Sequence, residues 1–314
     1  MSRPHVHIII VNFKKWEDTR ECLDAVFAST YENYSVFVVD NHSENGSLAH
    51  LSRWIDDRNA GSATAGISQL AYVNATVEEL YSMLSPDVRL YLLQNSRNAG
   101  FAAANNEVIS RLLKREGFCW LLNPDMVVQP ATLRCFVECM GDPGHRIIAG
   151  STILQYGGNQ RLITYGGFKV KFYTATVIPI TSPAKANEMD YVSGGCLFTA
   201  MTTFRTLGLL PERYFLYWEE TDWCHQAKQQ GFELRLCEKA VCYDKGSTSI
   251  GKSFIADYYY ARNGLLFIHH FRRQNLPIVL FFLSLRFLKR ILAGRWDRAK
   301  GIYQGTLDFL NRRK

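Results

Sequence analysis

The stretch of residues 119–128 places a carboxylate directly after a strongly apolar run. Residues 120–122 are Trp-Leu-Leu, which is typical of a short strand covered on both faces of a sheet. Pro124 has no backbone N–H and a fixed φ, so the strand should end there and the chain should turn. Asp125 would then follow the carboxyl end of a buried strand, where open α/β sheets bind ligands. Taken alone, the tripeptide could equally be an Asn-Pro-Asp surface turn without function.

The segments before this stretch predict a parallel sheet. Residues 7–11 and 35–39 are apolar, and residues 17–29 between them have the periodicity of an amphipathic helix. A strand–helix–strand unit of this length places two parallel strands in one sheet. A further apolar strand is predicted over residues 88–93. The fold class expected is therefore α/β, with a mostly parallel sheet flanked by helices.

The second half of the chain predicts less regular structure. Residues 147–198 contain short strands punctuated by glycine, typical of an antiparallel or mixed edge region, with a strand over 191–198 entered through a glycine pair. An aromatic strand is predicted over 214–218, followed by a helix over 222–230. A last strand is predicted over 234–243.

Polar residues follow each predicted parallel strand. Asp40 and Asn41 follow the second strand, Arg97 and Asn98 follow the third, and Asp125 follows the fourth. Because the carboxyl ends of parallel strands lie on one rim of a sheet, we expect these side chains to converge. This convergence favours a functional site over a set of surface turns.

The eight cysteines include no C-x-x-C pair, and most lie in apolar runs. We therefore expect reduced, mostly buried thiols in a cytosolic protein, and no zinc site. The apolar run over residues 6–11 is too short for the core of a signal peptide. The longest apolar run, residues 276–285, ends at Arg286 and is too short to span a membrane.

The net charge of +7 is concentrated at the C-terminal end, where residues 271–314 carry eleven Lys or Arg and two acids. Residues 277–292 interleave apolar side chains with Arg286, Lys289 and Arg290, as in an interfacial helix lying on anionic lipid. A helical hairpin packed on the rest of the chain and an oligomer interface are the alternatives. Nucleic acid is disfavoured because the charge is confined to a tail.

Seven short motifs occur in an order that resembles family 2 glycosyltransferases with a GT-A fold, most of all bacterial rhamnosyltransferase-like members. The motifs are residues 11–23 (VNFKKWEDTRECL), 38–41 (VVDN), 98–106 (NAGFAAANN), 122–125 (LNPD), 192–196 (VSGGC), 215–222 (FLYWEETD) and 258–263 (YYYARN). Each motif alone is weak evidence for this resemblance, whereas seven motifs in the family's order are strong evidence for it. The resemblance implies a GT-A domain over residues 1–264 and a basic amphipathic helical extension over 265–314.

The resemblance implies a nucleotide-sugar donor and a divalent metal ion, Mg²⁺ or Mn²⁺, that neutralises the departing diphosphate. Asp125 matches the last acid of the family's DxD motif, and Asn123 replaces the first. Asp244 replaces the histidine with which the family commonly completes the metal site, so we expect Asp125 and Asp244 as metal ligands. The expected donor-binding residues are Asn12, Asp40, Asn41, Arg97, Asn98, Gly100, Asn123 and Asp125.

Three acids, Glu219, Glu220 and Asp222, fall within four positions. Like charges this close raise at least one pKa, which suits a general base. The resemblance places the base at Glu220, and Glu219 and Asp222 are the other expected catalytic residues of this cluster. The alternative is an acidic helix N-terminus that stabilises the helix dipole without any catalytic role.

The resemblance also implies acceptor contacts at Gly194, Gly195 and Trp218, although Trp218 could simply fill the core. Gln226 replaces an arginine that is common in the family, which puts a phosphate or structural contact at that position in doubt. The function expected is inverting, metal-dependent transfer of a sugar, with dTDP-rhamnose favoured and UDP-sugars as an alternative. The acceptor would be a glycan or a polyprenyl-diphosphate-linked glycan in cell-surface polysaccharide synthesis, at the inner face of the plasma membrane. A possible homo-oligomer and a degenerate sugar-nucleotide-binding protein without catalysis stay open.

Overall fold

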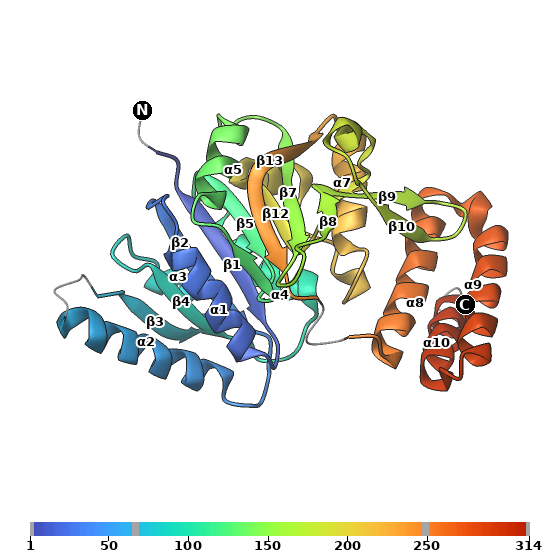
Figure 1. Cartoon of the computed structure of the whole chain (residues 1–314), viewed down its shortest axis with the longest axis horizontal. Coiled ribbons are helices and arrows are strands. Elements are labelled where there is room, and N and C mark those ends of the chain that lie inside the picture. Colours follow the sequence, from blue (N-terminus) through green and yellow to red (C-terminus); the bar gives the residue numbers. More distant parts are fainter. Residues whose placement is uncertain (1–2, 65–68, 247–250, 312–314) are drawn as a thin grey trace.

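A computed structural model of the chain describes residues 3–64, 69–246 and 251–311 (Figure 1). The last three basic residues of the sequence lie outside this part. One large twisted sheet is covered by helices on both faces, and the three helices α8, α9 and α10 lie together beside it. The mostly parallel α/β sheet and the helical C-terminal region expected from the sequence are confirmed.

Ten of the described strands form the large sheet. In spatial order they are β3 (Tyr72–Thr76), β4 (Leu90–Gln94), β2 (Tyr34–Asp40), β1 (Val6–Asn12), β5 (Phe118–Leu122), β12 (Cys196–Ala200), β7 (Ile147–Gln155), β13 (Glu233–Asp244) and β6 (Met126–Val128), with β8 (Leu162–Tyr165) paired to β7. In this spatial order, the neighbouring strands β3, β4, β2, β1 and β5 are all parallel. Strand β12 lies between β5 and β7 and runs antiparallel to both. The smaller sheet contains β10 (Thr176–Pro179), β9 (Gly167–Lys171) and β11 (Tyr191–Val192).

Helices cover the two faces of the large sheet. The described α-helices are α1 (Trp16–Phe27), α2 (Ser47–Thr64), α3 (Leu80–Met83), α4 (Phe101–Leu112), α5 (Thr132–Met140), α6 (Met201–Leu207), α7 (Glu219–Gln229), α8 (Phe254–Phe271), α9 (Leu276–Leu292) and α10 (Trp296–Asn311). Short 3₁₀ helices are η1 (Pro183–Glu188), η2 (Glu212–Tyr214) and η3 (Arg273–Asn275). Alternate residues of β1 enter two cores: Ile8 and Ile10 pack with α1, α2 and α5, whereas Ile9 packs with α4 and α7. Strand β5 is buried along its whole length, as predicted from its apolar run.

Three predictions about the second half of the chain need correction. Residues 214–218 form no strand, because Phe215, Tyr217 and Trp218 have positive φ, which a strand cannot accommodate. The predicted strand over 191–198 divides at its glycine pair into β11 and β12, which belong to different sheets. Strand β12 lies inside the large sheet rather than in an edge region. In the first half of the chain, the edge strand β3, which has mixed polarity, was not predicted.

The C-terminal helices pack tightly on one another. Gly301 and Gly305 of α10 face α8, and a Cβ at these positions would lie 2.5 Å from Phe254 O and 2.4 Å from Tyr258 O. Helix α8 also runs without a break across the boundary proposed after residue 264. None of the described helices is long and apolar enough to cross a membrane.

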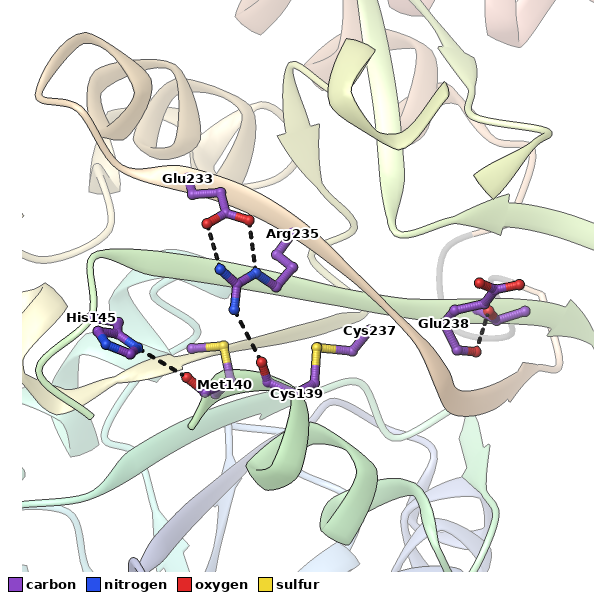
Figure 2. Close-up of a disulfide and its surroundings, with 8 residues drawn as sticks. Cys139, Met140, His145, Glu233, Arg235, Cys237 and Glu238 are labelled. Carbon is purple, nitrogen blue, oxygen red and sulfur yellow. Dashed lines mark hydrogen bonds and ion pairs between the residues drawn. A yellow bond between two sulfur atoms is a disulfide. The ribbon is translucent and has the colours of Figure 1, made fainter. Parts of the chain in front are cut away.

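The expectation of reduced thiols is wrong for one pair, because Cys139 and Cys237 form a disulfide (Figure 2). The bond links the end of α5 to β13, where the two Cα atoms lie 5.8 Å apart. Arg235 of β13 also donates to the carbonyl oxygen of Cys139 (3.1 Å) and pairs with Glu233. Sequence spacing could not reveal the pair, since its members are 98 residues apart. The remaining described cysteines are free thiols: Cys22, Cys119, Cys135, Cys196, Cys224 and Cys242.

Candidate active site

Asp40 lies at the carboxyl end of β2 and is held by protein donors on both oxygens. Asn12 donates to Asp40 Oδ1 (2.6 Å), and Ser43 Oγ donates to the same atom (2.5 Å). The side chain of Gln94, at the end of β4, donates to Oδ2 (3.2 Å). The carboxylate therefore ties together the ends of β1, β2 and β4, and it is only 3% exposed.

Asn41 joins the loops that follow β2 and β4. Its amide nitrogen donates to Asn98 Oδ1 (2.9 Å), and its oxygen accepts from Asn95 Nδ2 (3.1 Å) and from the backbone N–H of Ala99 (3.2 Å). Arg97, in the same loop, is exposed and makes no ion pair with any residue that the structure describes. The predicted convergence of these loops is therefore present, with the arginine left free to meet an anion.

The structure brings Asp125 and Asp244 together. Strand β13 ends at Asp244, which pairs with Met126 of β6, and the next residue, Lys245, donates its backbone N–H to Asp125 O (3.1 Å). Burial and the neighbouring Asp244 raise the pKa of Asp125 to about 6. Burial also raises the pKa of Asp244. Two partly buried carboxylates therefore lie close together beyond the end of β5.

This pair fits a hard divalent cation that also takes ligands from a bound diphosphate. Mg²⁺ and Mn²⁺ prefer oxygen ligands, and Mg²⁺ is commonly held by one or two carboxylates together with substrate phosphates. Within the described residues, no group of three or more His, Cys, Asp or Glu side chains is placed to hold a metal. Asp125 and Asp244 would therefore supply only part of the coordination shell.

Lys245 is a charged neighbour of this pair that the sequence did not single out. Its ammonium group contacts Asp18 Oδ1 (3.0 Å) and Glu21 Oε2 (2.5 Å) of α1, and its side chain is only 11% exposed. It thereby ties the end of β13 to the first helix. Its positive charge also lowers the pKa of Asp125, which opposes the effect of burial.

Glu219 and Glu220 form the first turn of α7, which begins three residues earlier than predicted. Burial raises the pKa of Glu220 to about 7, while hydrogen bonds from the backbone N–H groups of Glu220 and Thr221 oppose the shift. Burial, and then the charge of Glu220, raise the pKa of Glu219 well above its usual value. Glu219 Oε2 is buried and has no hydrogen-bond partner among the residues that the structure describes. Glu219 is thus suited to stay neutral while Glu220 titrates near pH 7, as a general base requires.

The glycine pair between β11 and β12 contacts both Glu220 and the turn that carries Asp125. A Cβ at Gly194 would lie 3.1 Å from the carboxyl carbon of Glu220. A Cβ at Gly195 would lie 2.6 Å from Met126 Cε and 3.4 Å from the side-chain nitrogen of Asn123. Gly195 O also accepts from the backbone N–H of Asn123 (2.9 Å). The turn that carries Asp125 and the carboxyl of Glu220 therefore flank consecutive glycines.

Asp222 is fully buried, and its carboxylate is occupied by three donors. Tyr214 Oη donates to Oδ2 (2.5 Å), Arg213 forms an ion pair with the same oxygen, and Gln226 Nε2 donates to Oδ1 (2.5 Å). These contacts favour a role in holding the N-terminal end of α7 rather than contact with a substrate. Gln226, which departs from the family pattern, makes a structural contact here.

Trp218 lies in an aromatic core. It is 3% exposed and packs against Tyr260 and Phe267, with ring centroids 5.6 and 5.1 Å away. Its position favours the core-filling alternative that the sequence left open. Gly100 also has a packing role, because a Cβ there would lie 2.3 Å from the carbonyl oxygen of Phe215.

The first part of the chain matches a known protein family. Residues 7–61, which run from β1 into α2, match the family described as glycosyl transferase family 2. The hexosyltransferase Agl10 of low-salt glycan biosynthesis from Haloferax volcanii is 23% identical over 216 residues. That match covers 66% of this chain and 65% of the relative's length.

Solved structures with bound sugar nucleotides share the fold. The mannosyltransferase PcManGT from Pyrobaculum calidifontis, in complex with GDP-Man and Mn²⁺, superposes with a TM-score of 0.57 at 14% identity, covering 100% of this chain and 89% of that one. S. aureus TarS 1–349, in complex with UDP-GlcNAc, superposes with a TM-score of 0.54 at 16% identity, covering 97% of this chain and 80% of that one. The GT-A fold expected from the sequence is therefore confirmed, and its first strands and helices match glycosyl transferase family 2.

Proposed function

We propose that this protein is a metal-dependent, inverting glycosyltransferase that moves a sugar from a nucleotide-diphosphate donor to an acceptor hydroxyl. One observation carries the proposal: Gly194 and Gly195 lie between Glu220 and the turn that bears Asp125. A general base and a diphosphate-binding carboxylate are thereby separated by backbone without side chains. This arrangement suits sugar transfer, because the donor and the acceptor would meet between the two groups.

The donor would bind along the carboxyl ends of β1, β2, β4 and β5. We assign Asp40 and Asn41 to the nucleoside end of the donor, where they would hold the loops after β2 and β4 in place, because their own polar groups already bond within the protein. The exposed guanidinium of Arg97 would reach the phosphates. Asp125 and Asp244 would hold Mg²⁺ or Mn²⁺, which supplies positive charge to the leaving diphosphate. The fold shared with PcManGT, solved with GDP-Man and Mn²⁺, supports this placement.

Glu220 is the general base of the proposed reaction. It removes the proton of the acceptor hydroxyl while the hydroxyl oxygen attacks the anomeric carbon. The bond between that carbon and the diphosphate oxygen breaks, and the nucleoside diphosphate leaves with the electron pair. A single displacement of this kind inverts the anomeric configuration and needs one general base, the role that we assign to Glu220 beside Gly194.

We infer dTDP-rhamnose as the preferred donor from the rhamnosyltransferase-like motifs, with UDP-sugars as the alternative. The test is a panel of sugar nucleotides with Mn²⁺, scored by release of nucleoside diphosphate in the presence of glycan acceptors. Asp125→Ala should abolish metal-dependent binding of the donor. Glu220→Gln should leave binding intact and lower turnover by about 10²- to 10⁴-fold. Donor binding without transfer in the unaltered protein would instead indicate a non-catalytic sugar-nucleotide-binding protein.

The outer face of α9 supports an acceptor linked to lipid at the inner face of the plasma membrane. Its exposed apolar residues are Ile278, Phe281, Leu285, Leu288 and Leu292. Lys289 and Arg295 are exposed near them, so the surface combines apolar and cationic groups as interfacial helices do. Two of the arginines that suggested this role point inward instead: Arg290 pairs with Asp257 (3.3 Å), and Arg286 lies over the ring of Tyr260. The charge available to lipid headgroups is therefore smaller than the sequence indicated.

A further inference from the structure

The backbone just before the proposed base is strained. Phe215, Tyr217 and Trp218 have φ values of 68°, 65° and 78°, and Trp218 directly precedes the first residue of α7. Side chains disfavour this left-handed conformation because Cβ crowds the following carbonyl oxygen. Such a turn persists only when its surroundings hold it in place. The position of Glu220 therefore depends on whatever holds residues 215–218.

One buried amide from α8 contacts three carbonyl oxygens within this turn and directly before it. Asn263 Nδ2 lies 2.7 Å from Tyr214 O, 2.6 Å from Leu216 O and 3.1 Å from Tyr217 O. Arg262 Nε donates to Asn263 Oδ1 (2.8 Å), which turns the nitrogen of the amide toward those oxygens. The side chain of Asn263 is completely buried. Without it, these carbonyl groups would lose a donor that water cannot readily replace.

The turn is also held from the side of the donor loop. Phe101 donates its backbone N–H to Phe215 O (2.9 Å), and the missing side chain of Gly100 permits this approach. On the opposite side, the ring of Tyr259 stacks on Phe215 with centroids 4.9 Å apart. Residues 215–218 therefore lie between the loop that follows β4 and helix α8. Both neighbours belong to motifs noticed in the sequence, but no role was assigned to the one over residues 258–263.

We propose that Asn263, oriented by Arg262, is a positioning residue for Glu220: its amide holds the left-handed turn that sets the carboxylate against Gly194. Helix α8 is then part of the catalytic unit and not merely the start of a C-terminal extension. The inference rests on the proposed function for its kinetic consequence. The structural consequence, a turn that loosens without the amide, is independent of any activity.

The test compares Asn263→Ala with Asn106→Ala. Asn106 is 3% exposed, and its amide binds Leu210 O (2.8 Å) and Glu212 Oε1 (2.9 Å), so its removal also deletes a buried amide and its hydrogen bonds. None of its hydrogen bonds goes to residues 215–218. Three quantities are measured on both variants: turnover with saturating donor, the affinity for nucleoside diphosphate with Mn²⁺, and hydrogen exchange of the backbone amides over residues 215–222.

Asn263→Ala should lower turnover at least about tenfold while the affinity for nucleotide and Mn²⁺ changes less than about twofold. Exchange over residues 215–222 should be faster than in the unaltered protein. Asn106→Ala should keep most of its turnover and leave exchange in that segment unchanged. Arg262→Lys removes the Nε donor that orients the amide and the bond from Arg262 Nη2 to Tyr214 O (2.9 Å). It should show a weaker form of the same pattern and serves if Asn263→Ala does not fold.

Unchanged exchange over 215–222 in Asn263→Ala, or a loss of nucleotide affinity that parallels the loss of turnover, would overturn the inference. The second result would mean that the amide supports the whole fold rather than Glu220. If the unaltered protein transfers no sugar from any donor, the proposed function fails. Hydrogen exchange would still decide whether Asn263 holds the turn.

Discussion

The carboxyl group of Glu220 lies against Gly194, where a Cβ would stand 3.2 Å from Glu220 Oε1. The two residues belong to segments about 25 positions apart, and the contact forms only because the chain leaves β11 and enters β12 at this glycine pair. The absence of a side chain lets the carboxylate approach the backbone here, next to Gly195, which contacts the turn bearing Asp125. This relationship makes the glycine pair as important to the site as the acids.

Gly194→Ala should lower turnover without unfolding the protein. The added Cβ would crowd the Glu220 carboxyl, and displacement of a reacting group by about 1 Å can cost about 10²-fold in rate. We expect a loss of ten- to a hundredfold in turnover, roughly, and little change in donor affinity. Gly61→Ala is the matched control, because a Cβ at Gly61 in α2 meets nothing within 4 Å. Equal turnover in both variants would argue against Glu220 as the base.

Turnover should fall on the acid side of neutrality. Burial raises the pKa of Glu220 to about 7, and a general base acts only when ionised. Turnover should therefore decrease about tenfold per pH unit below that value and reach a plateau above it. Glu219, Tyr191 and Tyr260 lie near enough to influence this titration electrostatically. A profile that stays flat down to pH 5, measured at saturating donor, would contradict the assignment.

Glu220→Gln should stabilise the protein above neutral pH. A carboxyl whose pKa is raised from 4.5 in the unfolded chain to about 7 in the folded protein destabilises the fold when ionised. This destabilisation of the folded protein is absent below about pH 4.5, increases between about pH 4.5 and 7, and is complete above about pH 7. The glutamine variant should gain on the order of 1–3 kcal/mol of unfolding free energy at pH 8 and almost none at pH 4. Denaturant unfolding at both pH values measures the difference.

Much of the fold follows from local patterns in the sequence. The apolar runs of β1, β2, β4 and β5 are recognisable because strands buried on both faces need continuous hydrophobic residues. Asp40 and Asp125 could be placed on one rim because parallel strands all end there. The motif order then predicted the GT-A fold. These predictions rest on the hydrophobic pattern of short segments and on the rule that parallel strands end at the same edge of a sheet.

The features that the sequence did not predict depend on contacts between residues that are far apart in the sequence. The segment 214–218 has the composition of a strand, but Asn263 and Gly100 hold it in a left-handed turn that its own residues do not favour. The Cys139–Cys237 disulfide likewise joins positions that only the packing of α5 on β13 brings together. Asp222 looked like a third catalytic acid until the structure showed its three donors. Local sequence propensity does not indicate which distant residues will contact one another.

The disulfide should contribute substantially to stability. It closes a segment of 98 residues between α5 and β13, and a cross-link of this kind typically adds about 2–4 kcal/mol. A thiol reductant should therefore lower the midpoint of thermal unfolding of the unaltered protein. The double variant Cys139→Ser/Cys237→Ser should have the lower midpoint already and show no response to the reductant. Cys135→Ser, which removes a free thiol of the same helix, should behave like the unaltered protein.

The outer face of α9 should bind anionic vesicles. Phe281 and Leu288 are 58% and 50% exposed on one side of the helix, and Lys289 is exposed beside them. Apolar burial in the interface and attraction to anionic headgroups should act together. We therefore expect sedimentation with vesicles that contain phosphatidylglycerol and little sedimentation with pure phosphatidylcholine.

Phe281→Ser/Leu288→Ser should abolish this binding, and Lys289→Glu should weaken it and reduce its dependence on salt. Tyr81→Ser is the control, because Tyr81 is 63% exposed on α3, which packs at the β3 end of the large sheet. If the double variant changes sedimentation velocity but not vesicle binding, α9 is an interface between copies of the chain and the lipid assignment is wrong. Loss of vesicle binding with unchanged turnover on a short, lipid-free acceptor would show that the face brings the enzyme to its acceptor and takes no part in the chemistry.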